Sequence, residues 1–324
     1  MTFEKDILNL PFQAKENLRL IQYSLSGGEK MYCQIDENNL RQDKFALLDK
    51  YGQPEAVGTF KDDMLDGQFS EFFPSGELRA SSFFHKNTRV GQYMEFYENG
   101  QLAVDGELNA QGQKTGLWTL YDEDGCIKAK SSYKNDMLHG ESLIYEDDCL
   151  VEKRQYVHNR REGVQIEYYP SGVMKCQCVY RDDKLNGPNI DYYENGQKML
   201  VNRYENGDPV GAYTYYYEEN GWYEKGTLDK DGFMDGVITF YGHDDNPREE
   251  HTYKHGVLDG RTTYFWPDGS KKWSLLYKDG KSLDYGSFLY GPNELFAYKA
   301  GKGYEQVWPP KTPLLLTAKK DKQR

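Results

Sequence analysis

The chain has 324 residues and carries 52 acidic against 40 basic side chains, a formal net charge of −12. This acidity argues against nucleic-acid binding, because contact with a phosphate backbone needs a basic surface. Much of the apolar area lies in 28 tyrosines, 15 phenylalanines and 5 tryptophans, and 32 glycines indicate many turns. Aromatic rings favour strands over helices.

The sequence shows no segment that would direct the chain into or across a membrane. No apolar run reaches the ~18 residues that a spanning helix needs, and the opening residues, Met1–Asp6, lack a basic start followed by an apolar stretch. Five cysteines are odd in number and too sparse for a disulfide scaffold: Cys33, Cys126, Cys149, Cys176 and Cys178. We therefore expect reduced thiols and a cytoplasmic location.

The first expected part of the chain is a capping segment over residues 1–42. Its apolar positions, among them Leu8, Phe12 and Ile21, fall outside the repeat that follows. The end of a repeat array exposes an open sheet edge that would recruit other chains. A segment that covers this edge is therefore expected at the N-terminus.

Residues 43–286 repeat with a period of about 24 residues. Glycines recur at positions 67, 91, 116, 140, 163, 187, 211, 236 and 260. The residue five positions after each glycine is aromatic: Phe72, Phe96, Tyr121, Tyr145, Tyr168, Tyr192, Tyr216, Tyr241 and Phe265. The residue seventeen positions after each glycine is apolar or aromatic: Phe84, Leu108, Tyr133, Val157, Tyr180, Tyr204, Leu228, Tyr253 and Tyr277. These two positions are expected to carry the packing.

Turn signals separate the two positions within each repeat. Examples are Glu98-Asn99-Gly100 and Pro170-Ser171-Gly172, in which Asn and Gly readily adopt positive φ. The flanking residues alternate with period two, which is typical of strands. Each repeat therefore predicts a β-hairpin, and hairpins that are marginal alone are expected to stack edge to edge. The predicted fold is all-β: an elongated single-layer antiparallel sheet of about ten stacked hairpin repeats, open rather than closed, with terminal caps.

Two repeats depart from the pattern, and the frame ends after residue 286. Asp148-Cys149 lacks the turn glycine, and residues 241–246 replace the usual turn, so both loops are expected to protrude or to bend the sheet. Residues 287–310 are rich in aromatic positions and predict a C-terminal cap. Residues 311–324 end in Lys319, Lys320, Lys322 and Arg324 and predict a disordered basic tail.

The recurring glycine, the paired aromatic residues, the Glu-Asn-Gly or Pro-Ser-Gly turn and the Leu-Asp/Asn/His-Gly ending resemble the MORN repeat. The closer resemblance is to the bacterial MORN variant of YwqK-family antitoxins, over roughly residues 43–286. This resemblance implies an array of stacked hairpins that serves as an interaction module, often as an immunity protein beside toxin or effector genes. It implies no catalytic residue.

Short matches to enzymatic or metal-binding motifs are incomplete. Gly280-Lys281-Ser282 ends like a phosphate-binding loop, but that loop needs glycine where Leu275 stands. Asp229–Gly232 lacks the remaining ligands of a calcium loop and is interpreted as a turn. Cys176 and Cys178 could offer two thiolates to a metal, but no second cysteine pair completes the set, and the histidines show no metalloprotease spacing. We therefore expect no enzyme activity, no cofactor and no metal.

The position six residues after the repeat glycine offers a first candidate binding surface. It faces the opposite side of the strand from the aromatic position before it. Its aromatic members include Tyr97, Tyr169, Tyr193, Tyr217 and Trp266. Exposed Tyr and Trp are frequent anchors of protein interfaces. The alternative is ordinary sheet packing, since cross-strand aromatic pairs stabilise a sheet without any partner.

Two acidic turns offer a second candidate surface. Stacking is expected to bring Asp122-Glu123-Asp124 beside Glu146-Asp147-Asp148. A ridge of carboxylates could imitate phosphates, enter the basic cleft of a nuclease-like toxin and associate rapidly by electrostatic steering. The alternative is a solvated turn face that prevents aggregation.

Three functions remain open at this point. The first is a cytoplasmic immunity protein or antitoxin that binds a cognate toxin or secreted effector and occludes it. The second is a MORN scaffold in a signalling or membrane-associated complex, which the net charge of −12 disfavours because anionic lipid attracts basic proteins. The third is an enzyme with accessory repeats, but no segment long enough for a catalytic domain remains. We expect a protein partner, and neither nucleic acid nor a membrane.

Overall fold

The computed structural model describes residues 17–283 and 287–288, all of them in strands, turns or connecting segments. Its contacts divide the chain into two units, residues 1–160 and 161–324. The predicted basic tail, most of the predicted C-terminal cap and the first 16 residues of the predicted N-terminal cap lie outside the described residues. Among the described residues, no helix has the length and apolar content needed to cross a membrane.

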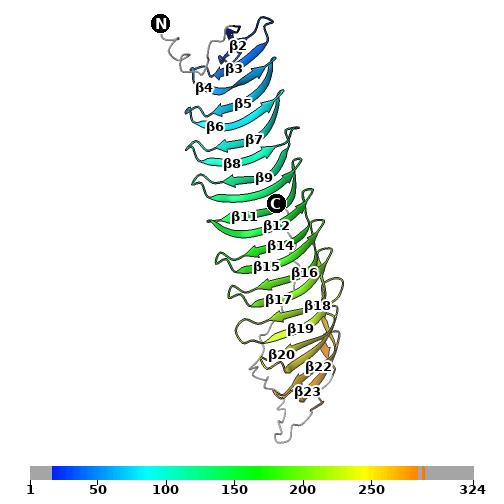
Figure 1. Ribbon diagram of the computed structural model, residues 1–324. Helices are drawn as coiled ribbons and strands as arrows, with labels where there is room; N and C mark the ends of the chain where they lie inside the picture. The colour runs from blue at the N-terminus through cyan, green and yellow to red at the C-terminus, as the bar shows by residue number, and fades with distance from the viewer. Residues whose placement is uncertain (1–16, 284–286, 289–324) are drawn as a thin grey trace. The chain divides into compact units, whose positions relative to one another are not determined.

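Unit 1 is an antiparallel sheet in which each strand pairs with its neighbours in the chain (Figure 1). Its strands are β1 (Arg19–Ser24), β2 (Lys30–Ile35), β3 (Arg41–Leu48), β4 (Pro54–Lys61), β5 (Met64–Phe72), β6 (Leu78–His85), β7 (Thr88–Phe96), β8 (Leu102–Leu108), β9 (Lys114–Tyr121), β10 (Ile127–Lys134), β11 (Met137–Glu146) and β12 (Cys149–Val157). The described part of the predicted N-terminal cap thus forms a further hairpin, β1 and β2, paired with β3.

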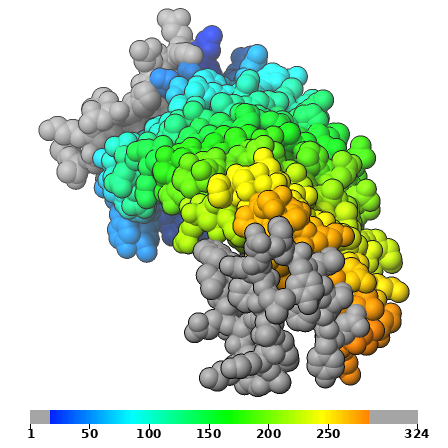
Figure 2. Space-filling view, turned by 90° about the horizontal axis from the view of Figure 1, so that it is seen from below, coloured from blue at the N-terminus to red at the C-terminus, as the bar shows by residue number. Residues whose placement is uncertain are grey.

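Unit 2 repeats the same arrangement after the short strand β13 (Arg160–Arg161). Its strands are β14 (Gly163–Tyr168), β15 (Met174–Arg181), β16 (Lys184–Tyr192), β17 (Lys198–Glu205), β18 (Asp208–Tyr216), β19 (Tyr223–Leu228), β20 (Gly236–Tyr241), β21 (Pro247–Lys254), β22 (Val257–Phe265), β23 (Lys271–Lys278), β24 (Lys281–Ser282) and β25 (Ser287–Phe288). In the space-filling view the last long strands, yellow to orange, lie next to one another (Figure 2). The predicted all-β fold, a single antiparallel sheet of consecutive hairpins that does not close, is confirmed.

Two kinds of turn alternate along each unit. In the longer turn, illustrated by residues 97–101, Gly100 has φ 85° and its N–H bonds the carbonyl of Tyr97 at 2.9 Å. In the shorter turn, illustrated by residues 86–87, both Lys86 and Asn87 have positive φ, 48° and 65°. Short turns of this hand match the right-handed twist of the strands that they join.

One position that is buried in most repeats lies two residues after the repeat glycine, and the sequence pattern did not single it out. In seven successive repeats this position is buried: Trp118, Ser142, Gln165, Asn189, Tyr213, Ile238 and Thr262. We call the side of the sheet that carries these residues the packed face. The aromatic position five residues after the glycine is only half-buried, so it contributes less to the core than its regularity suggests.

The prediction that the residue seventeen positions after the repeat glycine packs is wrong for Val157, because the repeat that contains it is shorter. Gly140 pairs with Tyr156, and Val157 is exposed. The cause is the turn without glycine, in which Asp147 and Asp148 alone join Glu146 to Cys149. This tight two-residue turn removes residues from the loop and shifts every later position of the repeat by one.

Candidate protein-binding site

The two acidic turns predicted from the sequence lie side by side in unit 1. They border a cleft of about 340 Å³ whose lining includes Asp122 and Lys128 from one turn and strand and Glu146, Asp147 and Asp148 from the other. Glu123 and Asp124 are exposed at the tip of the first turn. The structure therefore brings the two acidic turns together, while their contact with a partner stays a prediction.

The local sequence explains the shape of the cleft. Asp122 Oδ1 accepts the backbone N–H groups of Asp124 at 3.1 Å and Cys126 at 2.9 Å, so this carboxylate closes its own turn. Asp147 and Asp148 adopt φ of 47° and 60°, which Asp tolerates better than most residues other than glycine. The Asp122 carboxylate is thus used by its own turn, and the backbone of the second turn sets the places of Asp147 and Asp148.

A thiol links the two turns. Cys126 Sγ donates to Asp148 Oδ2 at 3.5 Å. The hydrogen bond to the Asp148 carboxylate raises the pKa of Cys126, and burial and the charges of Asp148, Asp122 and Asp124 act in the same direction. Four carboxylates and one lysine, Lys128, line the cleft, so it suits a cationic group.

The predicted tyrosines start the longer turns and are half-buried. The hydroxyl of Tyr97 donates to the carbonyl of Tyr121 at 2.8 Å, Tyr169 bonds the carbonyl of Tyr192 at 2.8 Å, and Tyr193 bonds that of Tyr216 at 2.7 Å. Each hydroxyl therefore joins one repeat to the next. These rings stabilise the stack, and any role in binding a partner stays a prediction.

Tyr217 and Trp266 make different contacts. The Tyr217 hydroxyl donates to Glu224 Oε2 at 2.7 Å on the packed face. Burial of the hydroxyl and the charge of Glu224 raise the pKa of Tyr217. The indole nitrogen of Trp266 is buried and has no hydrogen-bond partner among the described residues, while Lys272 Nζ lies 4.3 Å from the ring centroid. The five predicted aromatic side chains therefore do not form one uniform surface.

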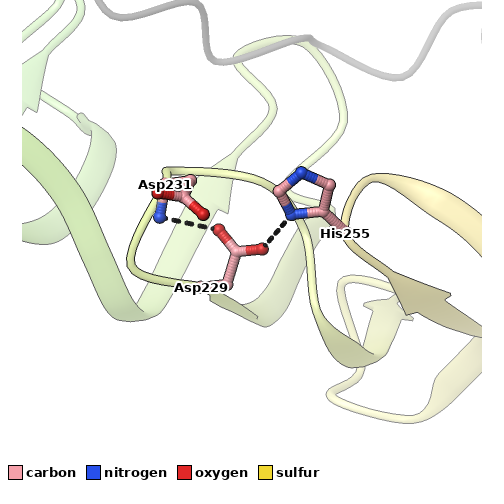
Figure 3. Close-up of side chains that lie close together, drawn as sticks. All are labelled: Asp229, Asp231 and His255. Carbon is pink, nitrogen blue, oxygen red and sulfur yellow. Dashed lines mark hydrogen bonds and ion pairs between the residues drawn. The ribbon is translucent and has the colours of Figure 1, made fainter.

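Asp229, Asp231 and His255 are the described side chains that could best hold a metal ion (Figure 3). His255 Nδ1 lies 2.7 Å from Asp229 Oδ2, and Asp229 Oδ1 accepts the N–H of Asp231 at 2.9 Å. Asn109 and Asn135 form the corresponding link between neighbouring turns in unit 1, at 3.0 Å, with two amides that make a poor metal site. The shared role of the two pairs is to connect successive turns.

Sequence reasoning missed a group of polar residues on the packed face of unit 2. Glu224 is 6% exposed and accepts hydrogen bonds from Tyr213 at 2.9 Å and Tyr217 at 2.7 Å. Two strands further, Glu249 Oε2 lies 2.7 Å from His251 Nε2. A comparison of all positions of the repeat could have found these two glutamates, because Glu224 and Glu249 both stand thirteen residues after a repeat glycine.

Comparison with known proteins gives a family match and only distant structural likenesses. The profile of the MORN repeat variant matches residues 89–109, 114–135 and 161–182. No curated protein matches this chain. Solved structures with some similarity include "Crystal Structure of TcdB2-TccC3-Cdc42", with 10% identity and a TM-score of 0.19, and "Structure of Photorhabdus luminescens Tc holotoxin pore, Mutation TccC3-D651A", with 10% identity and a TM-score of 0.16.

These alignments cover 81% and 80% of this chain but only 17% and 16% of the solved chains, so this chain spans about a sixth of their length. The TM-scores are too low to support an inference. The profile matches, by contrast, fall on hairpins that the structure shows: β7–β8, β9–β10 and the hairpin that follows β13. The chain thus contains repeats of the MORN repeat variant.

Proposed function

We propose that this MORN repeat scaffold is an immunity protein, of the kind found in YwqK-family antitoxins, that binds a cognate toxin or secreted effector and occludes its active site. The observation that carries the proposal is the acidic cleft between the turns at residues 122–126 and 145–148. Its carboxylates are presented on hairpin ends, where a partner can approach.

The negative charge of the cleft supports a partner with a basic surface. The cleft residues Glu146, Asp147 and Asp148 are exposed, as are Glu123 and Asp124 on the neighbouring turn. Such a group of like charges raises the encounter rate with a positively charged cleft, such as that of a nuclease, and disfavours acidic competitors. Binding alone is sufficient for this function, and no residue needs to react.

The cysteines support a cytoplasmic location as part of the proposal. All five are free in the structure, and Cys126 uses its thiol as a hydrogen-bond donor. Free thiols are typical of proteins in reducing compartments.

Co-expression tests the immunity function. A toxin encoded next to this chain should stop growth when expressed alone, and co-expression of this chain should restore growth. The cleft variant Asp122→Asn, Glu123→Lys, Glu146→Lys, Asp147→Lys should lose the rescue. Asn keeps the turn acceptor of Asp122, and Lys86 already occupies the turn position of Asp147 at nearly the same φ.

The matched turn control is Glu98→Lys, Glu194→Lys, Glu219→Lys, Asp268→Asn, which changes the charge equally at exposed turns elsewhere. The turn control should still rescue growth. Equal rescue by both variants would show that the cleft does not carry the binding, and failure of the unsubstituted chain to rescue would exclude the immunity function.

A further inference from the structure

One row of residues crosses the packed face of unit 2 from strand to strand. The strand register pairs its members in succession: Glu167, Cys176, Asp191, Leu200, Tyr215, Glu224, Phe240, Glu249, Tyr264 and Trp273. We call this set the acidic row. It contains four carboxylates and no lysine or arginine.

The neighbouring row on the same face contains no lysine or arginine either. It includes Gln165, Cys178, Asn189, Asn202, Tyr213, Gly226, Ile238, His251, Thr262 and Leu275. The carboxylates are therefore held mainly by neutral donors: Tyr213 and Tyr217 bond Glu224, and Asn189 Nδ2 bonds Asp191 at 3.1 Å. Burial raises the pKa of Glu224, as expected where no strong cation compensates the charge.

Aromatic rings alternate with these carboxylates at the C-terminal end of the row. Tyr264 and Trp273 stack with ring centroids 3.9 Å apart, and His251 lies between Phe240 at 5.3 Å and Tyr264 at 6.0 Å. Among the described ion pairs, one lysine reaches the row: Lys175 Nζ lies 3.9 Å from Glu167 Oε2. A surface of rings and carboxylates with so little cationic compensation favours lysine- and arginine-bearing peptide, through ion pairs and contacts of cations with ring faces.

The chain itself supplies such a peptide next to the row. Strand β25 pairs with β23, and Phe288 stands opposite Trp273 in register, so the chain leaves the described sheet at the end of the acidic row. Residues 289–324 carry seven basic and three acidic side chains, and they include the apolar run Leu314-Leu315-Leu316. Residues 161–283 carry 21 acidic against 15 basic side chains, so the two segments have opposite net charge.

The reach of the segment is sufficient. An extended chain gains about 3.3 Å per residue, so residues 289–324 can span roughly 120 Å. The row crosses β14 to β23 at about 4.8 Å per strand, roughly 43 Å. We propose that the C-terminal segment, residues 289–324, docks on the acidic row of unit 2 and covers its aromatic and carboxylate side chains.

Site-specific cross-linking in the full chain tests the docking. A photoreactive Leu315→p-benzoylphenylalanine substitution places a cross-linker in the apolar run. Irradiation should join it to peptides of β18 to β23 within the same chain, as mapped by mass spectrometry. Mixing ¹⁵N-labelled and unlabelled chains identifies links between two copies, because these carry mixed isotopes.

Charge variants of the row show whether its carboxylates hold the segment. The row variant should lower the cross-linked fraction at least about fivefold; it combines Glu167→Gln, Asp191→Asn and Glu249→Gln. In the chain with the unsubstituted row, raising the salt concentration from about 0.05 to about 0.5 M should also lower the cross-linked fraction. The matched control is Glu194→Gln, Glu205→Gln, Glu250→Gln, of which Glu250 faces the other side of β21 because it follows Glu249. The control should keep the cross-links.

Three outcomes would overturn the proposal. Cross-links to residues outside the packed face would place the segment elsewhere, and mixed-isotope links would make a second copy the occupant. The absence of cross-links at every salt concentration would show that the segment does not dock, and a separate basic partner would then be the candidate occupant of the row. If the row variant unfolds, the salt series in the unsubstituted row still decides between these results.

Discussion

Glycines inside the strands make room for the rings that cross them. A Cβ atom on Gly106 would lie 2.3 Å from Trp118 Cδ2, and one on Gly226 would lie 2.2 Å from Ile238 Cδ1. Neither glycine has a positive φ, so backbone conformation does not explain them. Space does: the side chain at the buried position lies over the neighbouring strand.

Gly106→Ala is therefore expected to destabilise the protein by about 1–3 kcal/mol, the usual cost of overpacking. Urea unfolding measures the change. In the background of Trp118→Leu the same substitution should cost clearly less, because the smaller side chain leaves room for the methyl group. An equal cost in both backgrounds would contradict the steric explanation.

Glu224 gives a prediction for pH dependence. Burial raises its folded-state pKa above the ordinary value of 4.5. A raised carboxyl pKa means that the folded state binds the proton more tightly, so this contribution to stability is present at low pH and is lost as pH rises through the folded pKa. Glu224→Gln should therefore gain stability relative to the unsubstituted chain as pH rises above about 4.5.

Thermal unfolding at a series of pH values between about 4 and 7 measures this difference. Glu250→Gln on β21, on the other side of the sheet, serves as the control and should show no such trend. A constant difference between Glu224→Gln and the unsubstituted chain would show that Glu224 is not destabilised by its charge.

Successive hairpins are joined through the second residue of each short turn. Asn87 donates its N–H to the carbonyl of Leu65 at 2.9 Å, and its Oδ1 accepts the N–H of Leu65 at 2.7 Å. Asp63, Asp136, Asn159 and Asp183 repeat both bonds to Arg41, Lys114, Leu138 and Arg161. This explains why Asn and Asp recur at these turns: they satisfy both backbone groups of the preceding hairpin.

Two substitutions at Asn87 separate the contributions to this link. Asn87→Gly keeps the positive φ but removes the side-chain acceptor, and should cost about 1 kcal/mol. Asn87→Ala adds the strain of a positive φ and should cost roughly 1 kcal/mol more. Urea unfolding gives both values; a Gly variant as stable as the unsubstituted chain would show that the side-chain bond contributes nothing.

Much of the element-level architecture could be predicted from the sequence. The recurring glycines and aromatic residues locate the hairpins because they repeat in type. The most buried position does not repeat in type: it holds Trp118, Ser142, Asn189 and Ile238, so a search for constant chemistry passes over it. The turn at residues 242–246, expected to protrude, is also regular, since Asp245 takes the positive φ of the missing glycine.

The candidate sites were predictable only in part. The two acidic turns meet because equivalent turns of successive hairpins lie together. The period of the repeat is enough to predict this proximity. The acidic row depends on strand register, because bulges shift the pairing between Phe240 and Tyr241 and between Tyr264 and Phe265. Sequence spacing gives Glu224 and Glu249 the same repeat position, but it does not reveal these shifts, so it does not show that Phe240 and Tyr264 lie beside them.

At the scale of the whole molecule, the protein is a scaffold whose repeats each contact their neighbours in the chain. Stability in such an array is approximately a sum of repeat and interface contributions. Binding function can then be confined to a few hairpin ends, since exposed turn residues whose side chains make no bond to the neighbouring hairpin can be substituted without breaking the links between hairpins. The acidic cleft is a local feature of this kind.

The most direct test of the account is the association rate of the chain with its partner, captured by co-purification from the native cell. At low salt the cleft variant should associate at least about tenfold more slowly than the unsubstituted chain, and the turn control should stay within about twofold of it. Added salt should reduce the difference. Equal slowing by both variants, or unchanged rates in both, would contradict a binding function carried by the acidic cleft.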